Sequence, residues 1–193
     1  FVQNQDVTVE NVKFENAYID SPNTDAGIGF GCAVVIGTYE TNVAKNIKIN
    51  NVSVVNSSVK DMNAAAIIGY ARVTADVAPT CEISNIVTAN NTINCLAGGP
   101  GGRHGVIFGY YSFYNGATTT KLSNMILADS YQFVSNSQNL GNTSTYKNVS
   151  FKNIYTAFGK PENATYAYTG VTFNVDAGAL TGATAMTTAS ALA

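Results

Sequence analysis

Apolar and polar residues alternate along the start of the chain, and the alternation breaks once. Val7 and Val9 are two residues apart, as are Val12 and Phe14, but the two pairs are separated by a step of three. Successive side chains of a strand point to opposite faces, so an undisturbed strand would turn the second pair away from the face of the first. Asn11 stands at the break, and the pattern therefore predicts a corner in the backbone there.

The same break recurs four more times. The shared template is apolar-x-apolar-x-Asn-apolar-x-(apolar or Thr), and it returns in residues 47–56, 81–90, 120–129 and 149–158. Its asparagines are Asn11, Asn51, Asn85, Asn124 and Asn153, at intervals of 40, 34, 39 and 29 residues. Self-similarity at such a period is typical of repeat proteins in which each unit stacks on the one before.

A short apolar run with a central glycine follows the asparagine in three repeats. The runs are AVVIGTY (33–39), AAIIGYA (65–71) and GVIFGYY (105–111), which align Gly37, Gly69 and Gly109. Gly141 and Gly170 stand in weaker equivalents. Each repeat thus predicts a strand before the asparagine, a strand after it, and a third strand at the glycine.

Three short strands per repeat predict an all-β chain, folded as a parallel, right-handed β-helix solenoid of about five coils. Asparagine adopts the left-handed αL conformation more readily than most residues, and its amide can bond to the same amide one coil away. A β-propeller, with four strands in each blade of about 40–45 residues, is the second choice. The repeat domain is expected over residues 1–177, and the Ala/Thr-rich residues 178–193 form a cap or a linker.

Charged residues provide a check on this register. Lys48, Glu82 and Lys121 each lie three residues before a template asparagine, so stacking predicts an outward row of alternating sign. Three residues after the aligned glycines, Glu40 would face Arg72. Opposite charges on neighbouring strands favour such pairing by about 0.2–1 kcal/mol.

Composition narrows the class of protein. Of 193 residues only 11% are charged and the net charge is −2, and the absence of a basic patch argues against nucleic acid as a partner. No apolar run of about 18 residues predicts a membrane span in this segment. Low charge with many β-branched and small polar residues suits an extracellular or cell-surface protein. The chain starts at Phe1, as expected for a mature form or a piece of a longer chain or assembly.

The cysteines do not predict a metal site. Cys32, Cys81 and Cys95 lack the spacing of metal ligands, so neither metal nor cofactor is expected. Two alternatives remain for Cys81 and Cys95, which either form a disulfide within one repeat or are free thiols in the core.

Two stretches carry the similarity to a known family, namely CEISNIVTANNTI with GVIFGYY, and IKINNVSVVNSSV with AAIIGYA. They resemble the repeats of GLUG-motif and polymorphic-membrane-protein-like adhesins over about residues 4–170, although the Gly-Gly that begins the glycine run is replaced here. The resemblance implies a secreted or surface-attached β-helix that serves adhesion or scaffolding. Its implied partners are glycans or surface and filament proteins.

Chemistry-bearing residues are few. The loop GGPGGRHG (98–105) holds Arg103 and His104, which are candidate binding residues. Tyr70, Tyr110 and Tyr111 follow the glycine runs and are candidate binding residues as well, since they could stack on sugars. No clustered pair of acids with a base is apparent, so a non-enzymatic binding protein is expected, with no catalytic residues. The alternative is a carbohydrate-active β-helix enzyme, such as a polysaccharide lyase or glycoside hydrolase, acting at the loop 98–105.

Overall fold

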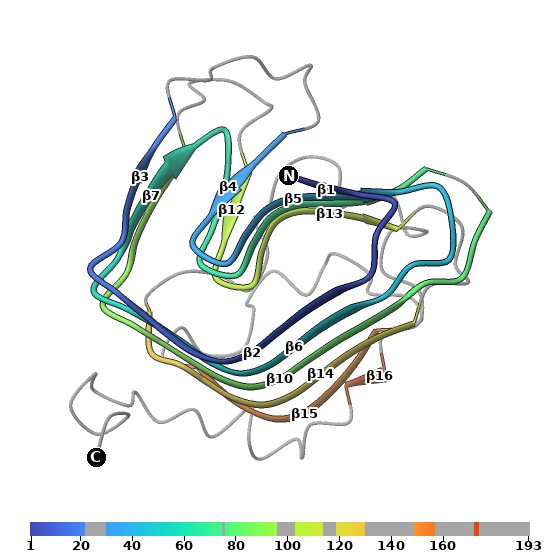
Figure 1. Cartoon of the computed structure of the whole chain (residues 1–193). Helices are drawn as coiled ribbons and strands as arrows, with labels where there is room; N and C mark the ends of the chain where they lie inside the picture. The colour runs from blue at the N-terminus through green and yellow to red at the C-terminus, as the bar shows by residue number, and fades with distance from the viewer. Residues whose placement is uncertain are drawn as a thin grey trace.

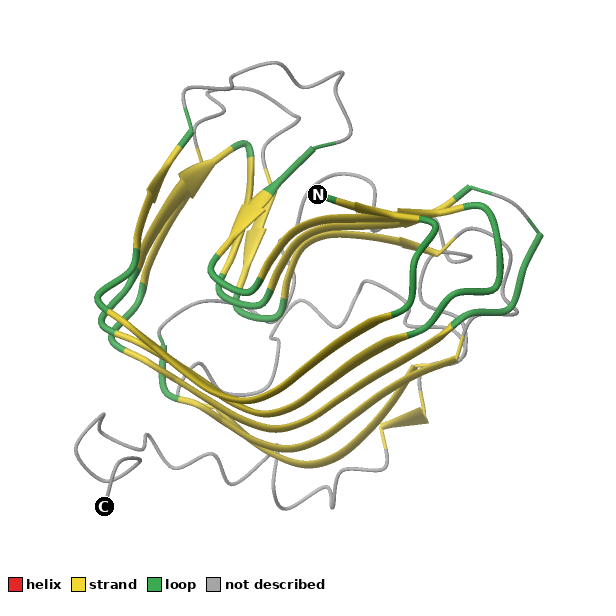
Figure 2. Cartoon of the chain, in the orientation of Figure 1, coloured by secondary structure: helices red, strands yellow, loops and turns green. Residues whose placement is uncertain are grey.

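The computed structural model describes residues 1–21, 30–74, 76–95, 103–113, 119–129, 149–156 and 172–173. Within these residues the chain forms β-strands and no helix (Figure 2). The strands make four sheets, here called sheets A to D, and every pairing in them is parallel. Residues 178–193, Gly141, Gly170 and the domain boundary at residue 177 lie outside the described residues.

The four sheets differ in length. Sheet A contains β1 (Val2–Gln3), β5 (Ile36–Thr41), β9 (Ile68–Val73) and β13 (Phe108–Phe113). Sheet B contains β2 (Val7–Glu15), β6 (Ile47–Val55), β10 (Thr80–Ala89), β14 (Thr119–Leu127), β15 (Val149–Thr156) and β16 (Thr172–Phe173). Sheet C contains β3 (Tyr18–Asp20), β7 (Ser58–Asp61) and β11 (Thr92–Cys95), and sheet D contains β4 (Cys32–Ala33), β8 (Asn63–Ala65) and β12 (Arg103–Gly105).

From β2 to β14 the chain passes through sheets B, C, D and A in that order and then returns to sheet B beside its previous strand (Figure 1). Such an arrangement of parallel sheets is compatible with a parallel β-helix. It differs from the prediction in its strands, because the two strands expected around each asparagine are one continuous strand. The short strands of sheets C and D are additional; those of sheet D have only two or three residues, too few to give a periodic signal.

The template asparagines bend the strands of sheet B. Asn11, Asn51, Asn85 and Asn124 have positive φ angles of 58°, 53°, 56° and 53°, and their neighbours are in register from strand to strand. Asn153 occupies the same place in β15, between residues that pair with Ser123 and Met125. The bend explains the step of three, since Ile49 and Val52 on either side of Asn51 are both buried, at 0% and 2% exposure.

A second set of corners closes the same strands five residues later. Asn16, Asn56 and Asn90 also have positive φ angles, of 57°, 52° and 56°. The backbone N–H of Asn16 donates to Val55 O, and that of Asn56 donates to Ala89 O, so the corners are bonded from one pass to the next. The sequence contains this signal too, as an asparagine at the end of three of the template segments.

The core lies between sheets A and B. Sheet B contributes a repeated inward set that includes Ile47, Ile49, Ile83 and Leu122, all at most 2% exposed. Cys81 belongs to this core as a free thiol, so the alternative of a Cys81–Cys95 disulfide is wrong. Burial raises the pKa of the Cys81 thiol, which keeps it protonated and unreactive.

The aligned glycines exist because sheet D packs against sheet A backbone to backbone. A Cβ on Gly69 would lie 2.6 Å from the backbone nitrogen of Cys32, and a Cβ on Gly109 would lie 2.9 Å from that of Ala64. Gly37, Gly69 and Gly109 are in register, as predicted, because the residues on either side of them pair. Glycine is therefore required for the close approach of β4 and β8 to the next strands of sheet A.

Candidate binding face on sheet A

The outer face of sheet A carries two rows of side chains that stack from strand to strand. Ala71 and Val73 are fully buried in the core, so the residues that alternate with them, Tyr70 and Arg72, lie on the opposite face. One row runs Thr38, Tyr70, Tyr110, and the next runs Glu40, Arg72, with the backbone of Ser112 at the following register position. Aromatic and charged side chains thus lie in neighbouring rows on one face of sheet A.

Two tyrosines of the first row stack on each other. The ring centroids of Tyr70 and Tyr110 are 4.6 Å apart and the ring planes differ by 10°. Tyr70 is only 4% exposed, while Tyr110 is partly exposed. Burial raises the pKa of the Tyr70 hydroxyl to about 12, although Arg72 beside it acts in the opposite direction. The hydroxyl therefore stays protonated and remains a hydrogen-bond donor across the physiological range.

Tyr111, the third tyrosine singled out from the sequence, occupies a different row. In β13 it pairs with Ala71, a core position, instead of with Tyr70. Its side chain lies outside the described residues. The backbone thus groups Tyr70 with Tyr110 and separates Tyr111 from them.

The charged row places opposite signs beside each other. Glu40 of β5 pairs in register with Arg72 of β9, which pairs in turn with Ser112 of β13. Both charged side chains are half-buried, and Arg72 contacts the Tyr70 hydroxyl through a side-chain hydrogen bond. A guanidinium next to an aromatic stack combines a flat apolar surface with directed donors, the combination that polar ring compounds require.

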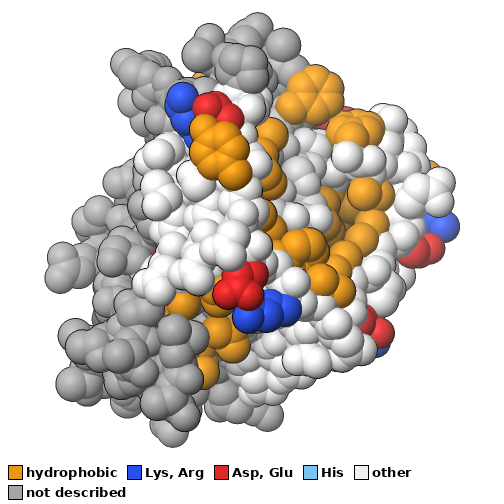
Figure 3. Space-filling view, turned by 60° about the vertical axis from the view of Figure 1, so that its left-hand side comes forward, with side chains coloured by type: hydrophobic (Ala, Val, Ile, Leu, Met, Phe, Trp, Pro, Cys, Tyr) orange, Lys and Arg blue, Asp and Glu red, His pale blue; other side chains and the backbone are white. Residues whose placement is uncertain are grey.

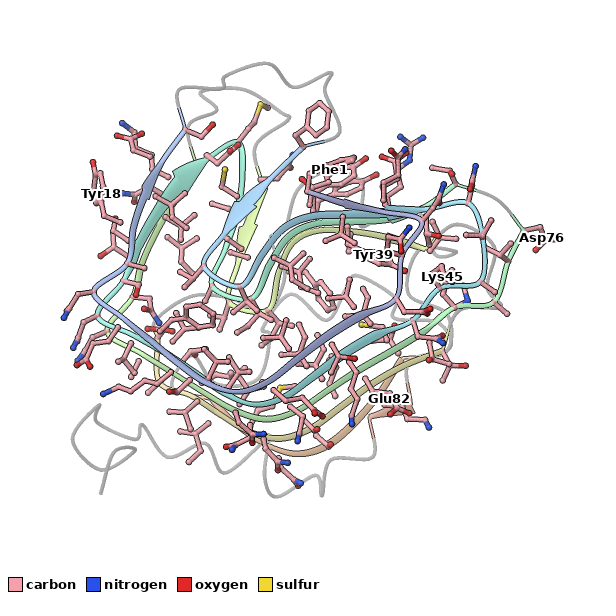
Figure 4. The ribbon with its side chains drawn as sticks, viewed as in Figure 1. Phe1, Tyr18, Tyr39, Lys45, Asp76 and Glu82 are labelled. Atoms are coloured by element: carbon pink, nitrogen blue, oxygen red, sulfur yellow. The ribbon has the colours of Figure 1, made fainter. Side chains whose placement is uncertain are left out.

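Two phenylalanines extend the aromatic surface. Phe1 precedes β1, whose Val2 pairs with Tyr39, and Figure 4 shows its side chain on the side of sheet A turned away from sheet B. Its ring meets that of Phe30 edge to face, with centroids 5.7 Å apart. Phe1 and Phe30 are 68% and 48% exposed. Such exposed aromatic residues are a common sign of a binding surface.

The segment 98–105, which contains the candidate binding residues Arg103 and His104, ends in β12, and β12 pairs with β8 of sheet D. Arg103 pairs with Asn63 and His104 pairs with Ala64, while both side chains lie outside the described residues. Asp61 stands two residues before Asn63, so the fold brings a carboxylate near this strand. Its Oδ1 accepts the backbone N–H groups of Met62 and Asn63, which assigns Asp61 to holding the turn between β7 and β8.

Asp61 also influences the neighbouring thiol. Cys32 of β4 is half-buried, and the pKa of its thiol is raised to about 12. The main cause is burial, and the next is the hydrogen bond to Asp61. The thiol is therefore a poor nucleophile and a poor metal ligand at neutral pH. Among the described residues no group of three or more His, Cys, Asp or Glu side chains is placed to hold a metal ion.

The predicted charge row on sheet B is present. Glu82 pairs in register with Lys48 and with Lys121, which confirms the strand alignment. Lys121 Nζ lies 3.0 Å from Glu82 Oε1, whereas Lys48 Nζ lies 2.7 Å from Oε1 of Glu10. Lys48 therefore forms its ion pair with Glu10 of β2, on the opposite side of β6 from Glu82, and the three side chains do not form one alternating row of ion pairs.

No protein-family model, curated protein or solved structure matches the chain. In the part of the chain that the structure describes, no helix has the length and apolar character needed to cross a membrane.

Proposed function

We propose that this chain is a parallel β-helix solenoid that serves as an extracellular adhesin or scaffold. The sheets return in a fixed order, and the five template segments, including Asn153 in β15, fit five successive coils. The likeness to GLUG-motif and polymorphic-membrane-protein-like repeats supports the same function, because those repeats share the asparagine corner and the glycine run. Binding, without catalysis, is the function that this arrangement favours.

The observation that carries the proposal is the stacked pair Tyr70 and Tyr110 beside Arg72 on the outer face of sheet A. Sugars bind to proteins through apolar ring faces and directed hydrogen bonds, and this surface offers both. Tyr70 is buried and serves as the rigid support, while the partly exposed Tyr110 contacts the ligand. We therefore infer that the ligand is a glycan held against Tyr110 and Arg72.

An extracellular location agrees with the state of the described thiols. Cys81 is buried and Cys32 has a pKa raised to about 12, so neither is readily oxidised. Exposed charges are mostly neutralised by partners one pass away, such as Lys45 with Asp6 at 3.1 Å. A surface of this kind suits a rigid support for a binding face.

A glycan array tests the proposal directly. The wild-type chain is expected to bind a subset of glycans. Tyr110→Ala is expected to weaken that binding by about fivefold or more, by analogy with the stacking of a nucleobase on an aromatic side chain, which is worth about 1–3 kcal/mol. Tyr18→Ala is the matched control, because Tyr18 is a 75% exposed tyrosine on sheet C, away from sheet A. Equal effects of the two substitutions would reject the sheet A face as the site.

The same preparation tests the enzymatic alternative. The chain is incubated with acidic and neutral polysaccharides, and new reducing ends are measured for the wild type and for an Arg103→Ala, His104→Ala double variant. The adhesin proposal expects no turnover by either protein. Turnover by the wild type that falls by about 10²–10⁴-fold or more in the double variant would establish the enzyme instead.

A further inference from the structure

Strand edges at the β2 end of the stack are unpaired among the described residues. β1, β2, β3 and β4 are each terminal in their sheets, and among the described residues no strand pairs with their outer edges. A row of unpaired N–H and C=O groups is a template for another strand. β2 is the longest of these edges, with nine residues, and it contains no proline that would block pairing.

The inward side chains of β2 are incompletely covered. Val7, Val9, Val12 and Phe14 are partly exposed, whereas their register partners in β6 are at most 2% exposed. Figure 3 shows hydrophobic side chains gathered in a band across this end of the molecule. A further strand laid along β2 would cover these four residues in the way that β2 covers those of β6.

The bend at Asn11 makes the apolar pattern of β2 symmetric. Its inward residues stand at positions 7, 9, 12 and 14, a series that has the same spacing in both chain directions. When β2 is laid antiparallel to β2 of a second copy, Val7 faces Phe14 of that copy and Val9 faces its Val12. All four apolar residues of each copy then stay on the inner side. In a strand without the bend, positions 7 and 9 would face the side opposite to positions 12 and 14.

The backbone amides of β2 agree with that register. The N–H of Val7 donates to Asn46 O at 2.9 Å, and the N–H of Asn16 donates to Val55 O at 3.2 Å, so these amides point toward β6. Successive amides along a strand alternate in direction, so the N–H of Thr8 and the N–H of Lys13 point to the open edge. In the antiparallel register Thr8 faces Lys13 of the second copy, which joins two residues with outward amides.

Charges do not oppose the pairing. At the middle of the register Glu10 faces Asn11 of the second copy, and Glu10 is already paired with Lys48. At its ends Glu15 approaches Asp6 of the second copy. Each of these two carboxylates has a lysine partner within its own chain, at 2.7 Å for Lys13–Glu15 and 3.1 Å for Lys45–Asp6.

We propose that two copies of this chain associate about a two-fold axis through antiparallel pairing of β2, which joins their sheets B edge to edge. A two-fold contact uses the same surface on both copies and closes on itself, so it gives a dimer and not a fibre. The dimer would present two sheet A faces in one particle. It does not depend on the glycan-binding function and can be tested without a ligand.

Sedimentation equilibrium of the full chain tests the proposal. The wild type is expected to sediment as a dimer, twice the 20.3 kDa mass of the chain. Thr8→Pro removes an amide that points to the open edge and leaves the bonds to β6 in place, so this variant is expected to be a folded monomer with an unchanged circular dichroism spectrum. Thr8→Val is the control, keeps the amide, and is expected to remain a dimer.

Cross-linking tests the register even if Thr8→Pro fails to fold. Copies carrying Val9→Cys are mixed with copies carrying Val12→Cys, and the antiparallel register predicts a disulfide-linked pair that wild-type chains do not form. Absence of that pair, a monomeric wild type, or a dimer retained by folded Thr8→Pro would each overturn the proposal. A mass that grows steadily with concentration would replace the two-fold dimer with head-to-tail stacking.

Discussion

Asn51 donates its side-chain amide to Asn11 Oδ1 across 2.8 Å, and both residues have left-handed backbone angles. The two functions of the corner asparagine, to bend the strand and to bond to the next turn, are thus present in one pair. They can be separated by substitution, since glycine keeps the first function and alanine loses both.

Asn51→Ala is expected to lower the free energy of unfolding by about 1–2 kcal/mol for the left-handed backbone, with a smaller addition for the lost side-chain bond. Asn51→Gly is expected to cost less, because glycine adopts φ near 53° without strain. Urea unfolding followed by circular dichroism measures both. Equal losses would show that the side-chain bond, and not the bend, is what the asparagine supplies.

Gly109→Ala is expected to destabilise the chain by at least about 1–3 kcal/mol. A Cβ there would meet the backbone of Gly69 and Ala64 at 2.5 to 2.9 Å, and backbone atoms cannot move aside as a side chain can. Gly37→Ala is the matched control in the same row, because its nearest contact is 3.0 Å and the next is 3.9 Å. Thermal melting of the two variants should rank Gly109→Ala well below Gly37→Ala.

Asp129 is expected to make stability depend on pH. It is 3% exposed, and burial raises the pKa of its carboxyl above 3.8, although hydrogen bonds from Asn91 oppose the shift. The folded state therefore binds the proton more tightly, so this contribution to stability is present below pH 3.8 and is lost as the pH rises through the folded pKa. The difference in unfolding free energy between the wild type and Asp129→Asn, measured across this range, should isolate the effect.

Glu82→Lys is expected to place three lysines in a row on sheet B, with Lys48 and Lys121 on either side. The loss should stay near 1 kcal/mol, because all three positions are exposed and solvent screens their charges. Added salt should recover most of it. Glu82→Gln, which removes the pair without adding repulsion, should show a smaller loss and a weaker dependence on salt.

Much of the fold could be predicted because stacking repeats one chemical requirement at each turn. Asn51 must bend the chain and Gly69 must admit another backbone, and few other residues do either. The strands of sheet D could not be predicted, since two or three residues that pack by their backbone leave no side-chain period. The rows of sheet A followed from the alignment of Gly37, Gly69 and Gly109.

The candidate site was only partly predictable. Tyr70 and Tyr110 were found from their position after the glycine, and the structure brings them together. Thr38, Arg72, Phe1 and Phe30 were not assigned to that site. Phe1 and Phe30 lie outside the template segments and the glycine runs, so no periodic signal marks them. Arg103 and His104 depend on side chains beyond the described part, so the sequence prediction for them stays a prediction.

The order of pairing in sheet B also decides how this chain must fold. β6 joins β2 across an interval of 40 residues, β10 joins β6 across 34, and β14 joins β10 across 39. The entropy of closing a loop varies only as the logarithm of its length, so these closures differ by about 0.2 kcal/mol or less and none is favoured as the first step. Any neighbouring pair of turns can therefore act as the folding nucleus, and growth then proceeds in both directions. In native-state hydrogen exchange, the inner strands β6, β10 and β14, each of which pairs with a long strand on both sides, should open later than the edge strand β2.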